Sequence, residues 1–247
     1  MRTLRQIVSF TLLCLSLPAL ADQVQVAVAA NFLAPMQAIA SQFKAATGHE
    51  AVVVSGSTGK LFAQVQHGAP FEVFVSADSK TPKKLAAASL ALADSQFTYA
   101  KGKLALWSPK ADAVKDESAL KGDFAHLAVA NPKTAPYGAA ALEVLAKLGL
   151  TDAVSGKLVE GENIGQTFQY VASGNAELGF VALSQIYQDG QLRQGSAWVV
   201  PTDLYSPLTQ DAILLKKGED NPAASALLAF LKGDQAKAII LQYGYML

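Results

Sequence analysis

The fold is decided by the stretch Val24-Gln25-Val26-Ala27-Val28-Ala29-Ala30-Asn31-Phe32-Leu33-Ala34-Pro35-Met36. Its first residues alternate, which predicts a β-strand that ends on small residues. A helix with a proline in its first turn follows at once. The N–H groups that open a helix have no partner within it, so they can hold an anion. The stretch therefore predicts a strand–loop–helix unit with an anion site at its turn.

The same unit recurs along the chain. Apolar runs predict strands at 52–54, 73–75, 127–130, 158–159, 178–181 and 198–200. The run at 52–54 is continuous, as expected of a strand covered on both faces. Apolar residues at helical spacing follow most of these strands, and the first predicted helix buries Met36, Ile39, Ala40 and Phe43. Repeated units of this kind imply parallel sheets with helices on both faces.

The alternation breaks at 97–107, where Lys101-Gly102-Lys103 joins two extended segments without a helix between them. This break predicts a crossing into a second lobe, and the apolar run at 212–215 is the expected return. The predicted fold is α/β, with two lobes that are each a mostly parallel sheet flanked by helices and that are joined by two crossing strands. Lobe 1 is expected to hold 22–100 plus 208–247, and lobe 2 to hold 101–207. The cleft between them is the usual ligand position.

The first 21 residues are typical of a cleavable export signal. Arg2 and Arg5 precede an apolar run at 7–20, and Ala19-Leu20-Ala21 fits a cleavage site. The run is short and ends on small residues, which disfavours a membrane anchor. Cleavage would leave 247 − 21 = 226 residues in the periplasm. The single cysteine, Cys14, lies in the removed segment, so the mature sequence can form no disulfide, thiolate nucleophile or Cys-based metal site.

The charge of the mature sequence argues against a nucleic-acid partner. Without Arg2 and Arg5, Lys+Arg falls from 20 to 18 against 20 Asp+Glu, a net charge of −2. A general nucleic-acid binder would show a basic face. No apolar run of the mature sequence is long enough to span a bilayer. We expect a monomer that binds a small molecule.

Four loops stand where a strand ends and a helix begins. They are Ala30-Asn31, Ser57-Thr58, Pro136-Tyr137-Gly138 and Asn163-Ile164-Gly165. All offer neutral donors, and none has a carboxylate at its centre. Such a set suits a small enclosed anion, because a buried countercharge would cost several kcal/mol to desolvate. Each hydrogen bond to a charged group contributes about 1.5–3 kcal/mol.

Each of these residues also has a structural interpretation. Asn31, Ser57 and Thr58 are common N-cap types. Tyr137 could be a packed aromatic side chain, and Ile164 could contribute only its backbone. Near these loops, Lys60 is expected to be a solvated helix residue. Asp78 is expected to bond the turn that follows it.

The sequence offers little support for an enzyme. His49, His67 and His126 are far apart and lack a spacing that would place two imidazoles on one metal. A nucleophile elbow, a Walker loop and a dinucleotide fingerprint are missing from the sequence. An exported hydrolase using Asp78 or Glu160 remains a weaker alternative. Tyr243 and Tyr245 fit either a phenolate iron site or an ordinary helix end.

An ordered set of motifs resembles the periplasmic molybdate-binding proteins of ABC importers. The motifs are Val28–Phe32, Ser55–Leu61, Gly68–Asp78, Asn131–Gly138, Leu178–Ala182 and Leu231–Gly233. The set covers essentially the whole mature sequence. The resemblance implies a two-lobed type II binding protein that closes over molybdate or tungstate and delivers it to a membrane permease, with no cofactor and no catalysis.

The resemblance also implies a ligand shell. Asn31 and Thr58 would bind through side chain and backbone from the first lobe, with Ala30 and Ser57 as neighbours. Tyr137 and the N–H of Ile164 would bind from the second lobe.

The sequence departs from many members of that family at two positions. They have Ser at the position of Asn31, and a Tyr near the position of Ala182. An Asn-Phe-type subgroup, which this sequence resembles more, uses a tyrosine at the position of Tyr137. Sulfate, phosphate or ferric ion on the same lobes remain alternatives, and discrimination against sulfate would depend on cavity size.

Overall fold

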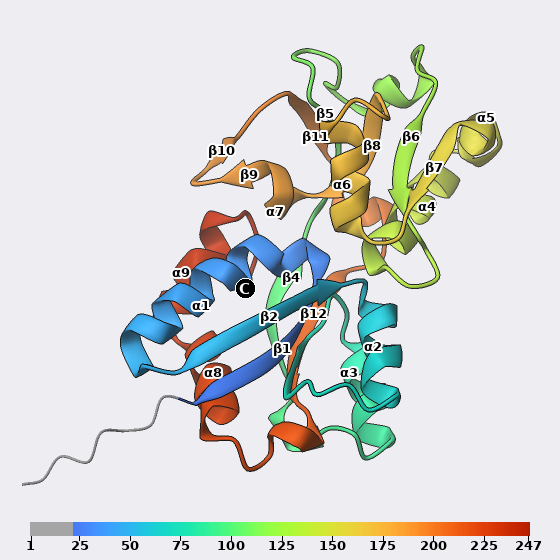
Figure 1. Ribbon diagram of the computed structural model, residues 1–247. Helices are drawn as coiled ribbons and strands as arrows, with labels where there is room; N and C mark the ends of the chain where they lie inside the picture. Colours follow the sequence, from blue (N-terminus) through green and yellow to red (C-terminus); the bar gives the residue numbers. More distant parts are fainter. Residues whose placement is uncertain (1–21) are drawn as a thin grey trace, which may run out of the picture.

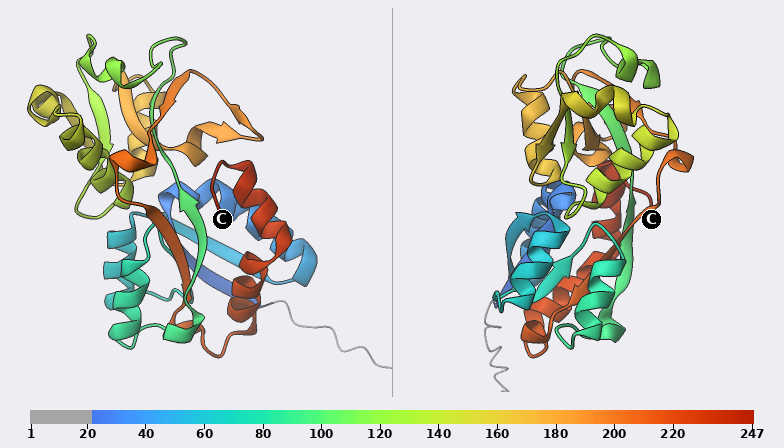
Figure 2. Two further views of the ribbon diagram at one scale, coloured as in Figure 1. Left: turned by 180° about the vertical axis from the view of Figure 1, so that it is seen from behind. Right: turned by 90° about the vertical axis from the view of Figure 1, so that its right-hand side faces the viewer.

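The computed structural model describes residues 22–247, and the predicted signal peptide at 1–21 lies outside the described residues. Two five-stranded sheets, each flanked by helices, form two lobes that lie one above the other (Figure 1). A third, two-stranded sheet is the hairpin β9 (Tyr187–Gln188) and β10 (Gln191–Leu192). The views from behind and from the side show the two connections that run between the lobes (Figure 2). The predicted two-lobed α/β fold is confirmed.

The first sheet has the order β2-β1-β3-β12-β4. Its strands are β1 (Gln23–Ala29), β2 (Glu50–Gly56), β3 (Val73–Val75), β4 (Phe97–Gly102) and β12 (Leu208–Leu214). β1 pairs parallel with β2 and β3, whereas β12 pairs antiparallel with β3 and β4. Four strands therefore run one way, and β12 runs the other way.

The second sheet has the order β11-β5-β8-β6-β7. Its strands are β5 (Leu104–Ser108), β6 (Leu127–Ala130), β7 (Leu158–Gly161), β8 (Leu178–Ala182) and β11 (Ser196–Val199). β6 pairs parallel with β7 and β8, whereas β5 pairs antiparallel with β8 and β11. The odd strand of each lobe, β5 or β12, is the one that follows a crossing. A strand that enters from the cleft must run away from it, while the other strands end at the cleft.

Helices cover both faces of the first sheet. The helices of this lobe are α1 (Leu33–Thr47), α2 (Thr58–Gln66), α3 (Lys80–Ala87), α8 (Pro222–Lys232) and α9 (Asp234–Gln242). Along β1, Val26 and Val28 pack with Ile39 of α1 and Leu227 of α8, whereas Ala27 packs with residues of α2 and α3. This alternation follows from the two-residue period of a strand.

The second lobe carries α4 (Pro136–Lys147), α5 (Thr151–Val154), α6 (Ile164–Ala172) and α7 (Leu183–Ile186). Single 3-10 turns, among them η1 (Ala30–Phe32) and η5 (Thr202–Leu204), connect elements in both lobes. Among residues 22–247, no helix has both the length and the apolar character needed to cross a membrane.

Three details of the predicted elements are wrong. β2 lies at the edge of its sheet and Val54 is 39% exposed, so this strand is not covered on both faces. An apolar run does not reveal the place of its strand in the sheet. The returning strand β12 begins at Leu208, earlier than the run at 212–215. The pair Thr81-Pro82 predicts an N-cap followed by the first helical residue, but α3 begins at Lys80, so Thr81 is not its N-cap. The exact lobe boundaries stay a prediction.

Candidate functional site

Four helical N-termini meet at a small cavity between the lobes. They belong to η1 and α2 in the first lobe and to α4 and α6 in the second. The centre of a water-sized sphere can occupy about 10 Å³ of this cavity, and the described residues that line it carry no charged side chain. All six predicted site residues line it: Ala30, Asn31, Ser57, Thr58, Tyr137 and Ile164. Its other lining residues are Ala29, Gly56, Ala77, Ala135, Pro136 and Asn163.

Asn31 is 3% exposed, and protein acceptors engage its side-chain amide. Nδ2 donates to Oε1 of Gln210 at 2.8 Å and to the hydroxyl of Tyr245 at 3.0 Å. The backbone carbonyl oxygen of Asn31 accepts a hydrogen bond from Ser184 Oγ at 2.8 Å. The capping interpretation of Asn31 is wrong, because it lies inside η1 and the side chain caps no helix. Its two amide hydrogens are both used within the protein.

Ser57 and Thr58 present hydroxyl groups from the start of α2. Ser57 is the N-cap, and its Oγ accepts the Lys60 N–H at 3.4 Å, which confirms the capping interpretation for this residue. Oγ1 of Thr58 accepts the Ala77 N–H at 3.2 Å. A hydroxyl group both accepts and donates. Each side chain therefore keeps a proton for a group in the cavity.

Tyr137 lies in the first turn of α4 and is 1% exposed. Its hydroxyl oxygen accepts from Nε2 of Gln210 at 3.0 Å, so its own proton remains available. Burial, and secondarily the neighbouring Tyr245, raise the pKa of Tyr137 well above its ordinary value. The phenol is therefore neutral and can donate at any physiological pH. A Cβ on Gly102 would lie 2.1 Å from this oxygen, so only glycine leaves room for it.

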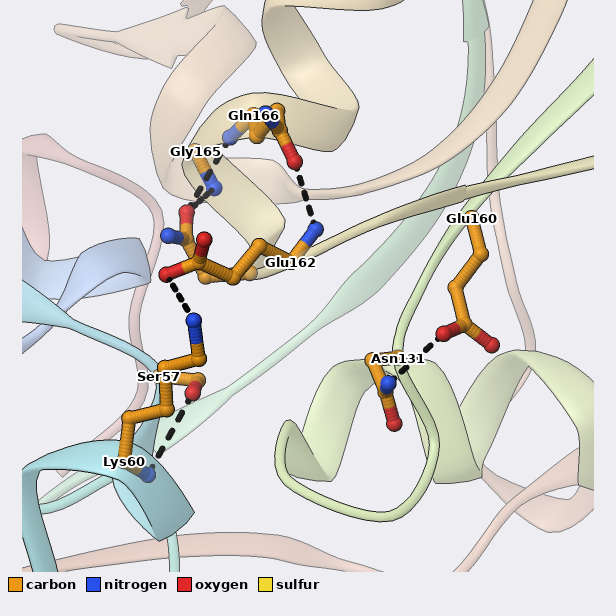
Figure 3. Close-up of polar contacts among 8 residues, drawn as sticks. Ser57, Lys60, Asn131, Glu160, Glu162, Gly165 and Gln166 are labelled. Carbon is orange, nitrogen blue, oxygen red and sulfur yellow. Dashed lines mark hydrogen bonds and ion pairs between the residues drawn. The ribbon is translucent and has the colours of Figure 1, made fainter.

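The backbone of Ile164 opens α6. Oδ1 of Asn163, the N-cap, accepts the N–H groups of Gly165 at 2.9 Å and Gln166 at 3.1 Å. Figure 3 shows this turn, with Gly165 and Gln166 above the chain of Glu162. The N–H of Ile164 comes before the first intrahelical bond and keeps no helical acceptor.

A buried polar cluster behind Asn31 and Tyr137 was not predicted. Gln210 is fully buried, and Ser184 and Tyr245 are less than a tenth exposed. Gln210 and Asp211 precede the apolar end of their strand, and these polar residues were the available signal in the sequence. The hydroxyl of Tyr245 donates to Asn31, and burial raises the pKa of Tyr245 to about 12. The side chain is therefore a neutral phenol that bonds within the protein.

The charged residues singled out in the sequence lie elsewhere. The carboxylate of Asp78 accepts from the N–H of Thr81 at 2.6 Å and from its hydroxyl at 2.9 Å, as expected of a turn-bonding residue. Glu160 accepts from Asn131 Nδ2 at 2.6 Å (Figure 3). Lys60 is not simply solvated, because it pairs with Glu162 of the other lobe at 2.6 Å.

A larger cavity of about 510 Å³ adjoins the small one. It also lies between the lobes, and the two cavities share Thr58, Ala135 and Pro136. Charged side chains, including Asp78, Lys133 and Glu143, line it. We take the small cavity as the site because the donors of all four loops gather there.

Residues 24–246 match the family of bacterial extracellular solute-binding proteins. The chain belongs to this family. The solute-binding protein is 59% identical over 233 residues to the molybdate-binding protein ModA of Azotobacter vinelandii, which covers 94% of this chain and 92% of the relative. It is 49% identical over 234 residues to ModA of Rhodobacter capsulatus, with coverages of 94% and 91%.

A solved structure agrees with the sequence relatives. The periplasmic molybdate-binding protein of Azotobacter vinelandii superposes on the solute-binding protein with a TM-score of 0.88 at 43% identity. The alignment covers 91% of this chain and 99% of that one. The resemblance to the molybdate-binding protein family is confirmed.

Proposed function

We propose that this protein captures molybdate or tungstate in the small interlobe cavity and delivers it to the membrane permease of an ABC importer. One observation carries the proposal: neutral donors from four helical N-termini, two in each lobe, gather around one small cavity. Helix N-termini favour anions by about 0.3–1 kcal/mol each. The relatives named as molybdate-binding proteins support molybdate over other oxyanions.

The proposed shell uses both lobes. Thr58 and Tyr137 donate hydroxyl protons, and Ile164 donates its backbone N–H. Asn31 and Ala30 contribute backbone N–H groups at the start of η1, because the amide of Asn31 is engaged within the protein. Ser57 keeps a hydroxyl proton beside them. The oxyanion is held by these donors without a cofactor and without a protein ligand on the metal atom, and binding is not followed by catalysis.

The proposal includes a location and an assembly. Residues 1–21 direct export and are removed, and the mature protein acts in the periplasm as a monomer. Residues 22–100 plus 208–247 form the first lobe and 101–207 the second. Capture between two lobes gives the permease a closed, loaded form to recognise.

A thermal-shift titration of the purified mature protein tests this function. Molybdate and tungstate should raise the melting temperature, since a ligand that binds only the native state stabilises it by about 2.7 kcal/mol at one hundred times its Kd. Sulfate, phosphate and ferric citrate are titrated separately as alternative ligands. A shift with one of these alone would select that ligand instead. No shift with molybdate or tungstate would contradict the proposal.

A further inference from the structure

We propose that Gln210 is a positioning residue that joins the ligand-binding groups of the two lobes and leaves the Tyr137 proton free for the oxyanion. The proposal rests on the proposed function, because it concerns the same cavity. Gln210 does not line that cavity. It acts through Asn31 in the first lobe and Tyr137 in the second.

The contacts of Gln210 reach both lobes. Its Oε1 accepts from Asn31 Nδ2 at 2.8 Å and from the Tyr99 hydroxyl at 2.9 Å. Its Nε2 donates to the Tyr137 hydroxyl at 3.0 Å. Gln210 belongs to the first sheet, whereas Tyr137 opens α4 of the second lobe. The contact with Tyr137 therefore depends on the approach of the lobes.

Two backbone features place the Gln210 side chain. The register of β12 against β4 shifts between Gln210 and Asp211. A bulge of this kind re-aims a side chain. On β4, Gly102 leaves the space in which Gln210 meets Tyr137, because a Cβ there would lie 2.4 Å from Nε2 and 2.1 Å from the Tyr137 oxygen.

The direction of these bonds decides which protons are free. Tyr137 has one proton, and since it accepts from Gln210, that proton can point to the cavity. With the amide of Gln210 reversed, Tyr137 would have to donate to Oε1 and could not donate to the ligand. The donor Nδ2 of Asn31, opposite Oε1, holds the amide in the productive direction. Asn31 is fixed in turn by Tyr245.

The competing interpretation is that Gln210, a buried glutamine, only stabilises the fold. A variant that carries a charge at this position distinguishes that role from the positioning role. In Gln210→Glu, an ionised carboxylate can only accept hydrogen bonds. Tyr137 would then donate its hydrogen bond to this carboxylate and not to the ligand, and the negative charge would repel an oxyanion. A protonated carboxyl group could again donate to Tyr137. The titratable side chains around position 210 are Tyr99, Tyr137, Tyr245 and Asp211. Burial raises the pKa of all three phenols, so they stay neutral below pH 9.

The experiment measures molybdate affinity by calorimetry between pH 6 and pH 8.5, together with the melting temperature of the ligand-free protein. We expect Gln210→Met to bind at least tenfold more weakly than the wild type at every pH. We expect Gln210→Glu to bind still more weakly at pH 8.5 and to recover as the pH falls. Wild-type affinity should change less than threefold over this range.

Asp211→Asn is the matched control. Asp211 is the next residue of the strand, is 4% exposed and bonds Gln96 and Thr98, not the residues around the cavity. The Asp211→Asn variant should be less stable than the wild type but bind molybdate with the same affinity.

The outcomes separate the two proposals. If the wild type fails to bind molybdate, the proposed function is wrong. If the wild type binds and both Gln210 variants bind within twofold of it at all pH values, the role of Gln210 is overturned. Gly102→Ala is a second variant that separates Tyr137 from Gln210 without removing either polar group. Its affinity should fall at least tenfold, and an unchanged affinity would also overturn the inference.

Discussion

At the scale of single residues, the site consists of neutral donors that the protein itself orients. The hydroxyl oxygens of Thr58 and Tyr137 each accept a hydrogen bond from the protein, so their own protons can point into the cavity. No countercharge lines the cavity among the residues that the structure describes. Affinity should therefore depend on individual hydrogen bonds, which are directional, and only weakly on the net charge of the protein.

Tyr137→Phe should bind molybdate about tenfold to one hundredfold more weakly, because one hydrogen bond to a charged group contributes about 1.5–3 kcal/mol. Calorimetry gives this loss. Asn31→Ala should lose both affinity and stability, since the amide holds Gln210 and Tyr245. The loss in affinity should exceed the loss in stability for Tyr137→Phe, whose hydroxyl is proposed to donate to the ligand.

Tyr205→Phe is the control for Tyr137→Phe. Tyr205 is 3% exposed, and its hydroxyl accepts the Leu104 N–H at 3.2 Å away from the cavity lining. The Tyr205→Phe substitution should lower the melting temperature and leave the affinity for molybdate unchanged. Equal losses of affinity in the two tyrosine variants would indicate a packing role for Tyr137.

Buried phenols should also make the protein sensitive to alkali. Burial raises the folded-state pKa of Tyr245 to about 12, above the ordinary value of 10.0. The folded state then holds a proton that the unfolded state releases, so stability is full below pH 10 and falls as the pH rises toward 12. Urea unfolding at pH 8, 10 and 11 measures this decline. In Tyr245→Phe the decline should be smaller, and an identical decline would contradict the assignment.

At the scale of elements, the N-termini of helices form the proposed binding site, and their caps set its geometry. α2 begins at the cavity with a serine cap, and α6 begins there with an asparagine cap. α8 has the same kind of cap at Asn221, on a helix that does not reach the cavity. These two asparagine caps of the described residues therefore differ in whether their helix begins at the cavity.

Asn163→Ala should lower the free energy of unfolding by about 1 kcal/mol, as the loss of an N-cap usually does. Asn221→Ala should lower it more, because Nδ2 of Asn221 also donates to the Gln23 carbonyl and the Glu72 carboxylate. Only Asn163→Ala should also weaken molybdate binding, because it releases the turn that presents the Ile164 N–H. Urea unfolding and calorimetry on both variants measure the two effects. If Asn221→Ala weakens binding as much, the effect is a general loss of stability.

At the scale of the whole molecule, some of the polar contacts that join the lobes lie beside the cavity. The Gly59 N–H donates to the Thr134 carbonyl at 2.9 Å, and a Cβ on Gly59 would lie 3.0 Å from Thr134 Cα. The Lys60–Glu162 pair spans the lobes nearby, as the dashed line between them in Figure 3 marks. Both charged side chains are about half exposed, at 50% and 49%.

Lys60→Met should release molybdate faster, by less than about fivefold, because an exposed ion pair contributes no more than about 1 kcal/mol. Glu162→Gln should have a similar effect, and the double variant should add little to either. Stopped-flow dissociation measures the rates, and salt should raise the wild-type rate toward that of the variants. Lys44→Met, which breaks the pair with Glu50 within the first lobe, should leave the rate unchanged.

Much of this molecule follows from local sequence patterns. Strand–loop–helix repeats are local, so the two lobes and the four loops could be located from periodicity and turn residues. The edge position of β2 could not, because pairing partners decide it. The odd direction of β5 and β12 follows from the crossings between the lobes.

The sequence by itself determined the α/β fold and the four loops that meet at the cavity, because each loop lies next to the strand and helix that place it. Only the tertiary structure decided which of their protons are free. Asn31 and Gln210 are 179 positions apart, and Asn31 and Tyr245 are 214 apart. Hydrogen bonds at such separations leave no local pattern, and they turn the amide of Asn31 inward while leaving the proton of Tyr137 for the ligand.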